Sequence, residues 1–145
     1  MYKRQAKDEL VQAIDADTEA FNEVIAALRM AKDTPDQVAV RARAIRAGYK
    51  SAARVPLRTA QLCRQVMDLC QAAADIGNRA VMSDAGVGAL MAYAGVQGAI
   101  HNVRINLPHT KDDAFIDSMR STLDQLLGES KALCAAIQQQ VEDSF

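Results

Sequence analysis

A chain of 145 residues has the length of a single domain, with enough interior for a hydrophobic core. Half of its residues are hydrophobic, 24% are charged and the net charge is −1, which excludes a disordered chain and argues against nucleic acid as the main partner. The sequence contains neither an apolar run of about eighteen residues nor a signal-peptide pattern, so we expect no membrane association and a cytoplasmic location.

The composition also predicts the fold class. Alanine is abundant, and the alternation of β-branched residues that is typical of strands is almost absent, so the sequence predicts an all-α protein. Its three cysteines, Cys63, Cys70 and Cys134, form no C-x-x-C pair. We interpret them as small buried hydrophobic residues in a reducing compartment.

The first predicted helix covers about residues 6–30. Its apolar residues recur at helical spacing: Leu10, Ala13, Ile14, Phe21, Val24, Ile25 and Leu28. The preceding residues carry no cap and no periodic pattern, so the helix has an abrupt start.

The second predicted helix begins at Thr34-Pro35-Asp36-Gln37, where Thr34 is an N-cap and Gln37 can complete a capping box. It runs to about Ile76, where Gly77-Asn78 can end it with a left-handed residue. Pro56 interrupts this helix. Because proline removes one backbone hydrogen bond and crowds the carbonyl of Ala52, we expect a kink there.

The third predicted helix covers residues 83–106, with Ser83 as its N-cap and Pro108 marking its stop. Three interior glycines each cost about 1 kcal/mol relative to alanine. A helical wheel places these glycines in one stripe with four other residues. The stripe consists of Asp84, Gly88, Met91, Gly95, Gly98, Asn102 and Asn106. Such a stripe indicates either tight packing against another helix or a flat ligand close to the backbone.

The last predicted helix is capped by Thr110 and covers residues 111–142, with six apolar residues facing inwards: Phe115, Met119, Leu126, Leu133, Ile137 and Val141. Every connection is short, so neighbouring helices should be antiparallel. The sequence therefore predicts one domain, residues 1–145, built as an up-and-down bundle of four long helices with the second kinked at Pro56.

Asp17 is the most informative candidate for chemistry. The wheel places its carboxylate in the centre of the apolar face of the first helix, whereas Asp15 points to solvent. A buried carboxylate takes a partner or changes its pKa. It is then either paired with Arg54 or Arg58 of the kinked helix, or it is a general acid/base.

Four further side chains are open to two interpretations. Arg54 and Arg58, one turn apart, could hold an anionic ligand or form an exposed charged turn. Asn102 and Asn106, one turn apart on the glycine stripe, could bind a ligand or the backbone of the next helix. His101 and His109 lack a further ligand at useful spacing, so we expect no metal site.

Three segments together resemble the formiminotransferase-cyclodeaminase family, in particular its cyclodeaminase domain and the bacterial methenyltetrahydrofolate cyclohydrolases. They are Asp15-Ala16-Asp17-Thr18-Glu19-Ala20-Phe21-Asn22, Val55-Pro56-Leu57, and the helix from Ser83-Asp84 to Asn102-Val103-Arg104-Ile105-Asn106-Leu107. The resemblance implies a dimeric, all-helical folate enzyme without metal or redox cofactor. It also implies that Asp17, the second acid of Asp-x-Asp, is the proton donor and acceptor.

The implied reaction closes 5-formiminotetrahydrofolate to 5,10-methenyltetrahydrofolate with loss of ammonia. The related cyclohydrolase reaction, and a non-catalytic helical interaction module, remain alternatives. Members of the family usually carry a Pro-Gly-Gly-Gly-Ser segment before the Asp-x-Asp helix, so the resemblance implies a chain truncated at its N-terminus. Asp84 and Asn102 are separated by roughly 27 Å of helix, so both cannot touch one reacting centre. We expect Asn102 and Asn106 near the reacting end, and Asp84 at the other end of a long folate or at the helix terminus.

Overall fold

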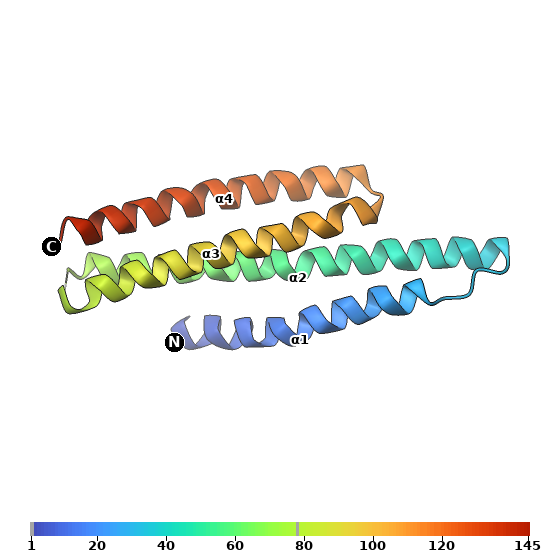
Figure 1. Ribbon diagram of the computed structural model, residues 1–145, viewed down its shortest axis with the longest axis horizontal. Helices are drawn as coiled ribbons and strands as arrows, with labels where there is room; N and C mark the ends of the chain where they lie inside the picture. Colours follow the sequence, from blue (N-terminus) through green and yellow to red (C-terminus); the bar gives the residue numbers. More distant parts are fainter. Residues whose placement is uncertain (1, 78) are drawn as a thin grey trace.

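The computed structural model describes residues 2–77 and 79–145, which form four helices (Figure 1). These are α1 (Tyr2–Leu28), α2 (Pro35–Asp75), α3 (Arg79–Thr110) and α4 (Asp113–Glu142). Consecutive helices run in opposite directions (Figure 1). The predicted all-α, antiparallel up-and-down bundle of four long helices is therefore confirmed.

Helix α2 is the centre of the bundle, as its wide apolar surface indicates. It packs against α1, α3 and α4, whereas α4 packs against α3 and α2. In the described part of the chain α1 packs against α2 alone. Because α1 and α3 do not pack against each other, a space lies between them on the surface of α2.

The start of α2 follows from local chemistry and was predicted correctly. The side chain of Thr34 accepts a hydrogen bond from the backbone N of Gln37, whose own side chain accepts from the backbone N of Thr34, which completes the capping box. Gly77 has φ +69°, the left-handed conformation expected after the helix. Asn78 lies outside the described residues. Helix α2 continues through Pro56, and the kink there stays a prediction.

The predicted start of α3 at Ser83 is wrong, because the helix begins at Arg79. Met82 is only 3% exposed, and burial of its side chain against α2 and α4 anchors a turn of helix ahead of Ser83. Ser83 is thus an exposed interior residue rather than an N-cap. Helix α1 differs less from its prediction, since it begins at Tyr2 and ends at Leu28.

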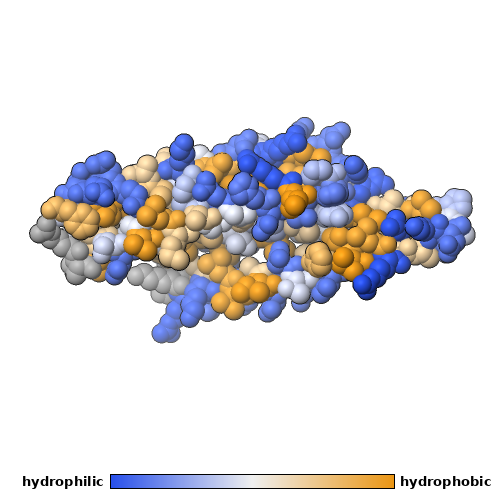
Figure 2. Space-filling view, viewed as in Figure 1, coloured by the Kyte–Doolittle hydropathy of each residue, from blue (hydrophilic) through white to orange (hydrophobic). Residues whose placement is uncertain are grey.

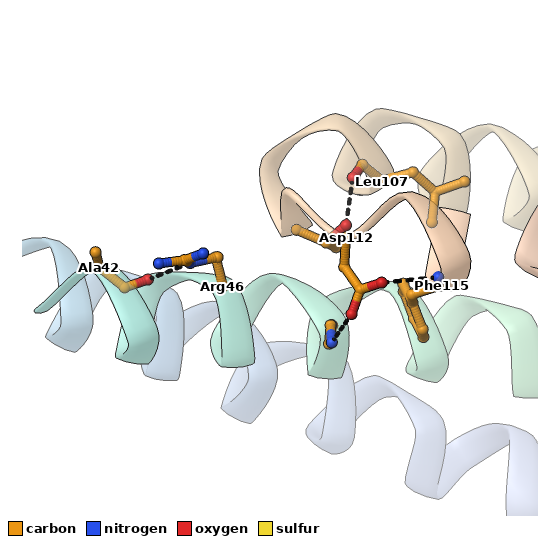
Figure 3. A network of polar contacts seen from close by, with 7 residues as sticks. Ala42, Arg46, Leu107, Asp112 and Phe115 are labelled. Carbon is orange, nitrogen blue, oxygen red and sulfur yellow. Dashed lines mark hydrogen bonds and ion pairs between the residues drawn. The ribbon is translucent and has the colours of Figure 1, made fainter. Parts of the chain in front are cut away.

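The connection between α3 and α4 was also predicted incorrectly. Helix α3 passes through Pro108 and ends at Thr110, which is fully buried and donates its hydroxyl hydrogen to the carbonyl of Leu107 at 2.8 Å. The N-cap of α4 is Asp112, whose carboxylate accepts from the backbone N of Phe115 at 3.0 Å (Figure 3). The same carboxylate pairs with the ammonium of Lys50 at 2.5 Å, which ties α4 to α2.

The hydrophobic core lies between α2, α3 and α4. Its fully buried residues include Ala53, Ala60 and Met67 of α2, Val96, Ile100 and Val103 of α3, and Leu123 and Ile137 of α4. Helix α1 contributes mainly small side chains, with Ala6, Ala20, Val24 and Ala27 buried. None of the described helices combines the length and the hydrophobicity that crossing a bilayer requires.

The apolar face of α1 is buried less than the sequence predicts. Ile14 is 67% exposed and Phe21 is 60% exposed, and Leu28 is exposed as well. Figure 2 shows apolar side chains on the surface along the lower edge of the molecule, where α1 runs. The reason is that α1 has a single neighbour among the described helices, so only the side that faces α2 is covered.

Candidate active site

A groove opens between α1 and α3, with α2 as its floor. One cavity in it has a volume of about 350 Å³. It is lined by Leu10, Ala13, Ile14, Asp17 and Thr18 of α1, by Pro56 and Thr59 of α2, and by Gly95, Ala99 and Asn102 of α3. We call it the Asp17 groove. It brings together a carboxylate, a carboxamide and two hydroxyl groups from three helices.

Asp17 lies in this groove, but it is exposed rather than buried, which corrects the sequence prediction. The wheel identified the correct side of α1, because the neighbouring residues Ala20 and Val24 on that side are buried. The prediction failed at Asp17 because α1 and α3 do not pack on each other, so the carboxylate faces an open groove.

The structure does not contain the alternative ion pair of Asp17 with Arg54 or Arg58. Arg58 pairs with Glu9 of α1, and the guanidinium of Arg54 lies over the ring of Phe115 at 5.3 Å from its centroid. Asp17 has no ion pair within residues 2–77 and 79–145. Its carboxylate is therefore accessible to a molecule that enters the groove.

Arg54 and Arg58 do not line the Asp17 groove, and both are exposed. Arg58 with its partner Glu9 borders a different cavity, of about 380 Å³. The interpretation of the two arginines as a pair that holds one anionic ligand is not supported by this placement. Each instead contacts a separate neighbour: Arg58 reaches α1, and Arg54 reaches α4.

Asn102 lies in the Asp17 groove with Asp17, as the sequence analysis expected for the reacting end. Its side-chain amide makes no hydrogen bond with another described residue, so both its donor and its acceptor can serve a ligand. Asn106, one turn on, does not line the groove. Its amide nitrogen donates to the carbonyl of Ala52 in α2 at 3.1 Å and to that of Asn102 at 2.8 Å.

Two of the α3 glycines are explained by tight packing against α2. A Cβ atom at Gly95 would lie 2.7 Å from the sulfur of Cys63, and one at Gly88 would lie 3.0 Å from the sulfur of Cys70. The tight-packing alternative is therefore confirmed for both positions. Gly98 is different, because a Cβ atom there would have no described neighbour within 4 Å.

Asp84 lies in a second cavity, which continues the groove towards the start of α3. This apolar cavity has a volume of about 840 Å³ and shares Leu10 and Ile14 with the Asp17 groove. Asp84 does not line the cavity that contains Asp17 and Asn102, and its place at the far end of a bound folate stays a prediction.

Sequence reasoning missed Thr59. Its half-buried hydroxyl lies in the Asp17 groove, and it donates to the carbonyl of Val55 at 3.4 Å. The hydroxyl oxygen retains lone pairs that can accept a hydrogen bond from a ligand. The available signal was its position one turn beyond Pro56, on the same side of α2.

Two of the thiols near α3, those of Cys63 and Cys134, are poor candidates for a nucleophile. Burial raises the pKa of the Cys63 thiol and that of the Cys134 thiol, which keeps both protonated at neutral pH. Cys134 is buried as expected, whereas Cys63 and Cys70 are half-buried, and none of the three is in a disulfide among the described residues. Within the same residues no group of three or more His, Cys, Asp and Glu side chains is arranged to hold a metal ion.

The groove of this all-helical bundle carries an acid, an amide and hydroxyl groups, which are side chains of the kinds that general acid/base chemistry uses. Residues 2–125 match the family model described as formiminotransferase-cyclodeaminase. The chain belongs to this family.

Two relatives agree with that membership, and one solved structure shares the fold. The methenyltetrahydrofolate cyclohydrolase of Methylorubrum extorquens is 40% identical over 133 residues, which is 92% of this chain and 64% of the relative. The formimidoyltransferase-cyclodeaminase of Sus scrofa is 36% identical over 137 residues, 94% of this chain and 25% of the relative. The crystal structure of formiminotetrahydrofolate cyclodeaminase from Thermotoga maritima has a TM-score of 0.83 at 22% identity, covering 97% of this chain and 66% of that chain.

These relatives are longer than the chain. It spans just under two thirds of the bacterial cyclohydrolase and a quarter of the porcine protein. The likeness to the Thermotoga maritima structure establishes the fold of the bundle.

Proposed function

We propose that the chain is the cyclodeaminase part of a folate one-carbon enzyme, which converts 5-formiminotetrahydrofolate to 5,10-methenyltetrahydrofolate and ammonia. The observation that carries the proposal is the accessible carboxylate of Asp17, which shares one groove with the amide of Asn102, a side chain without a hydrogen-bond partner among residues 2–77 and 79–145. The substrate class rests on the family and on the printed names of its members.

In the proposed reaction Asp17 moves one proton. N10 of the substrate attacks the carbon of the protonated formimino group (–CH=NH2+) on N5, and Asp17 accepts the proton that N10 loses. The resulting tetrahedral carbon carries N5, N10 and the amino group. Asp17 then donates the proton to this amino group, the bond from carbon to that nitrogen breaks, and ammonia leaves as the methenyl bridge forms. One positioned acid/base accelerates such a reaction by about 10²–10⁴-fold.

The groove would supply the remaining acceleration by holding N10 against the imino carbon. We assign to Asn102 the hydrogen bonds to the pterin edge, because a carboxamide offers both a donor and an acceptor. Thr59 borders the same cavity and can accept a further bond. The adjoining apolar cavity suits the flat aminobenzoyl part of a folate, with Asp84 on its wall beyond the reacting centre.

A second candidate is the cyclohydrolase reaction, favoured by the name of the relative from Methylorubrum extorquens that is 40% identical. Here Asp17 would take one proton from the water that attacks the methenyl carbon and give it to the departing ring nitrogen N5, while the second water proton is released to solvent as the formyl C=O forms on N10. Both reactions pass through a tetrahedral carbon between N5 and N10, so the same side chains serve either one.

The test is to incubate the purified chain separately with each substrate and to follow the absorbance of the methenyl group. A rise with 5-formiminotetrahydrofolate supports cyclodeaminase activity, and an accelerated fall with methenyltetrahydrofolate supports the cyclohydrolase. Titration with tetrahydrofolate measures binding independently. A chain that neither binds folate nor turns it over is the non-catalytic helical module instead.

The proposal includes a homodimer in the cytoplasm. The apolar and small residues exposed along α3 would meet a second chain, since Val87, Leu90, Met91 and Ile105 are each at least half exposed. The location is supported by Cys63 and Cys134, which form no disulfide among the described residues. The reaction consists of proton transfers and the making and breaking of carbon–nitrogen bonds, so the proposal invokes no metal or redox cofactor.

A further inference from the structure

Pro56 lies in the interior of α2 and leaves one backbone acceptor without its usual donor. In a regular helix the N–H of residue 56 would bond the carbonyl of residue 52, and proline has no N–H. Pro56 is buried and Ala52 is half-buried, so water does not fully replace this donor. A buried carbonyl without a partner is costly, and a substitute donor is expected nearby.

The substitute comes from α3. The side-chain nitrogen of Asn106 lies 3.1 Å from the carbonyl oxygen of Ala52, and 2.8 Å from the carbonyl oxygen of Asn102 in its own helix. A carboxamide nitrogen carries two hydrogens, so it can serve both acceptors at once. One side chain thus bridges the interrupted turn of α2 and the turn of α3 that carries Asn102.

We infer that Asn106 is a positioning residue, which replaces the backbone donor missing at Pro56 and fixes the register of α2 against α3 at the Asp17 groove. Pro56, Thr59 and Asn102 all line that groove. Their mutual placement depends on this register, because each side chain is fixed to its own helix. The role of Asn106 in catalysis rests on the proposed function. Its replacement of the donor that Pro56 lacks does not.

The two residues depend on each other. With any other residue at position 56, the backbone N–H would compete with Asn106 for the carbonyl of Ala52. Proline keeps that oxygen free for the side chain from α3. Asn106 does not line the groove, so its inferred effect there passes through its bonds to Ala52 and Asn102.

A double-mutant cycle tests the exchange of donors. Asn106→Leu, Pro56→Ala and the double variant are made in the whole chain, and their unfolding equilibria are measured in urea. Asn106→Leu should raise the unfolding constant about tenfold when Pro56 is present, and by less than about threefold in the Pro56→Ala background, where the alanine supplies its own N–H. An equal effect in both backgrounds would overturn the inference. If Asn106→Leu does not fold, Asn106→Asp replaces it, since aspartate keeps the shape and lacks the donor.

Gln138→Leu provides the matched control. The amide of Gln138 also bonds a helix carbonyl, that of Gly86 at 2.9 Å, but the acceptor there has its ordinary donor in α3. Its effect on unfolding should be the same with Pro56 and in the Pro56→Ala background, because the two sites share no partner. Coupling as large as that of Asn106 would show that Pro56→Ala loosens the bundle generally, which contradicts the inference.

The positioning role has its own readout, the side-chain amide resonances of Asn102 and the methyl resonance of Thr59 in the ligand-free protein. Asn106→Leu should shift these signals. The double variant should leave them shifted although its stability recovers, since the alanine N–H does not restore the bond between α2 and α3. If the resonances of Asn102 and Thr59 returned to their wild-type values in the double variant, Asn106 would have only a structural role, and the positioning role would be overturned. Failure of the wild-type chain to turn over folate would count against the proposed function alone.

Discussion

Asp17 of α1 and Asn102 of α3 line the same groove, although their two helices do not pack against each other. The floor between them is the Pro56 to Thr59 turn of α2. A site of this form has an open mouth along its length, and a long flat molecule can enter it from the side. The relation places a carboxylate and a carboxamide on opposite walls of one cavity, and the proposed proton transfers use both side chains.

The first prediction concerns the proton carried by Asp17. Asp17→Asn keeps the shape of the side chain and removes its basicity, so turnover of the folate substrate should fall by about 10²–10⁴-fold. Binding of tetrahydrofolate should change little. The measurement is the initial rate of absorbance change, together with a binding titration.

Asp15→Asn is the matched control for this substitution. Asp15 is exposed on the same helix and does not line the groove. Loss of the same charge two residues away should leave the rate within about threefold of wild type, in line with the small effects of exposed charges. Equal losses from both variants, or full activity of Asp17→Asn, would remove Asp17 from the chemistry.

The fold was predictable where local chemistry decides the structure. Thr34, Pro35 and Gln37 define the start of α2 through a cap, a fixed φ and a reciprocal side-chain bond, all of which act within one turn. Ser83 has a cap-forming side chain too, but the burial of Met82 extends the helix past it. That burial depends on α2 and α4, which a local pattern does not describe.

The sequence predicted which helix faces carry the site residues, but not how deeply those residues are buried. A wheel assigns Asp17 to the face of α1 that points at the bundle, and the structure agrees. Whether that face is covered depends on the spacing between α1 and α3, which no residue of α1 encodes by itself. The sequence indicates that the carbonyl of Ala52 needs a substitute donor, because Pro56 has no N–H. It does not identify Asn106 as the side chain that supplies this donor.

The second prediction separates two glycines of α3 by their surroundings. Gly95→Ala should destabilise the fold by about 1–2 kcal/mol, because the new methyl group would lie 2.7 Å from the Cys63 sulfur. Gly98→Ala should stabilise it by about 0.5–1 kcal/mol, since alanine favours the helix and no described atom lies within 4 Å. Urea unfolding of the two variants measures both effects.

The same pair of variants probes what approaches Gly98 in solution. If a second chain packs closely on this part of α3, Gly98→Ala should weaken the proposed dimer in sedimentation experiments while the isolated fold gains stability. An unchanged dimer would assign the interface to another surface. Destabilisation of the monomer by Gly98→Ala would contradict the open surroundings of this residue.

The third prediction concerns two buried hydroxyl groups. The hydroxyl of Ser130 is buried in α4 without a hydrogen-bond partner among the described residues, so Ser130→Ala should leave stability unchanged or raise it by about 0.5–1 kcal/mol. The hydroxyl of Thr110 is equally buried but bonds the carbonyl of Leu107. Thr110→Val should therefore cost about 1 kcal/mol. Thermal unfolding distinguishes the two, and a loss from Ser130→Ala would reveal a partner for its hydroxyl.

The last prediction is a pH dependence of stability at the junction of α2 and α4. The hydrogen bond from Lys50, followed by that from the backbone N of Phe115, lowers the pKa of Asp112 below its ordinary value. A carboxyl group whose pKa is lower in the folded state stabilises the fold above its unfolded pKa, near about 4, and this contribution disappears as the pH falls through the folded value. Asp112→Ala should thus destabilise the protein at neutral pH, and the difference from wild type should shrink as the pH is lowered below about 4.

Lys50→Met, which removes the largest cause of the lowered pKa, should show a weaker dependence of stability on pH in the same range. Urea unfolding at a series of pH values measures this, and a difference that stays constant down to the acid limit would show that Asp112 stabilises α4 independently of its charge.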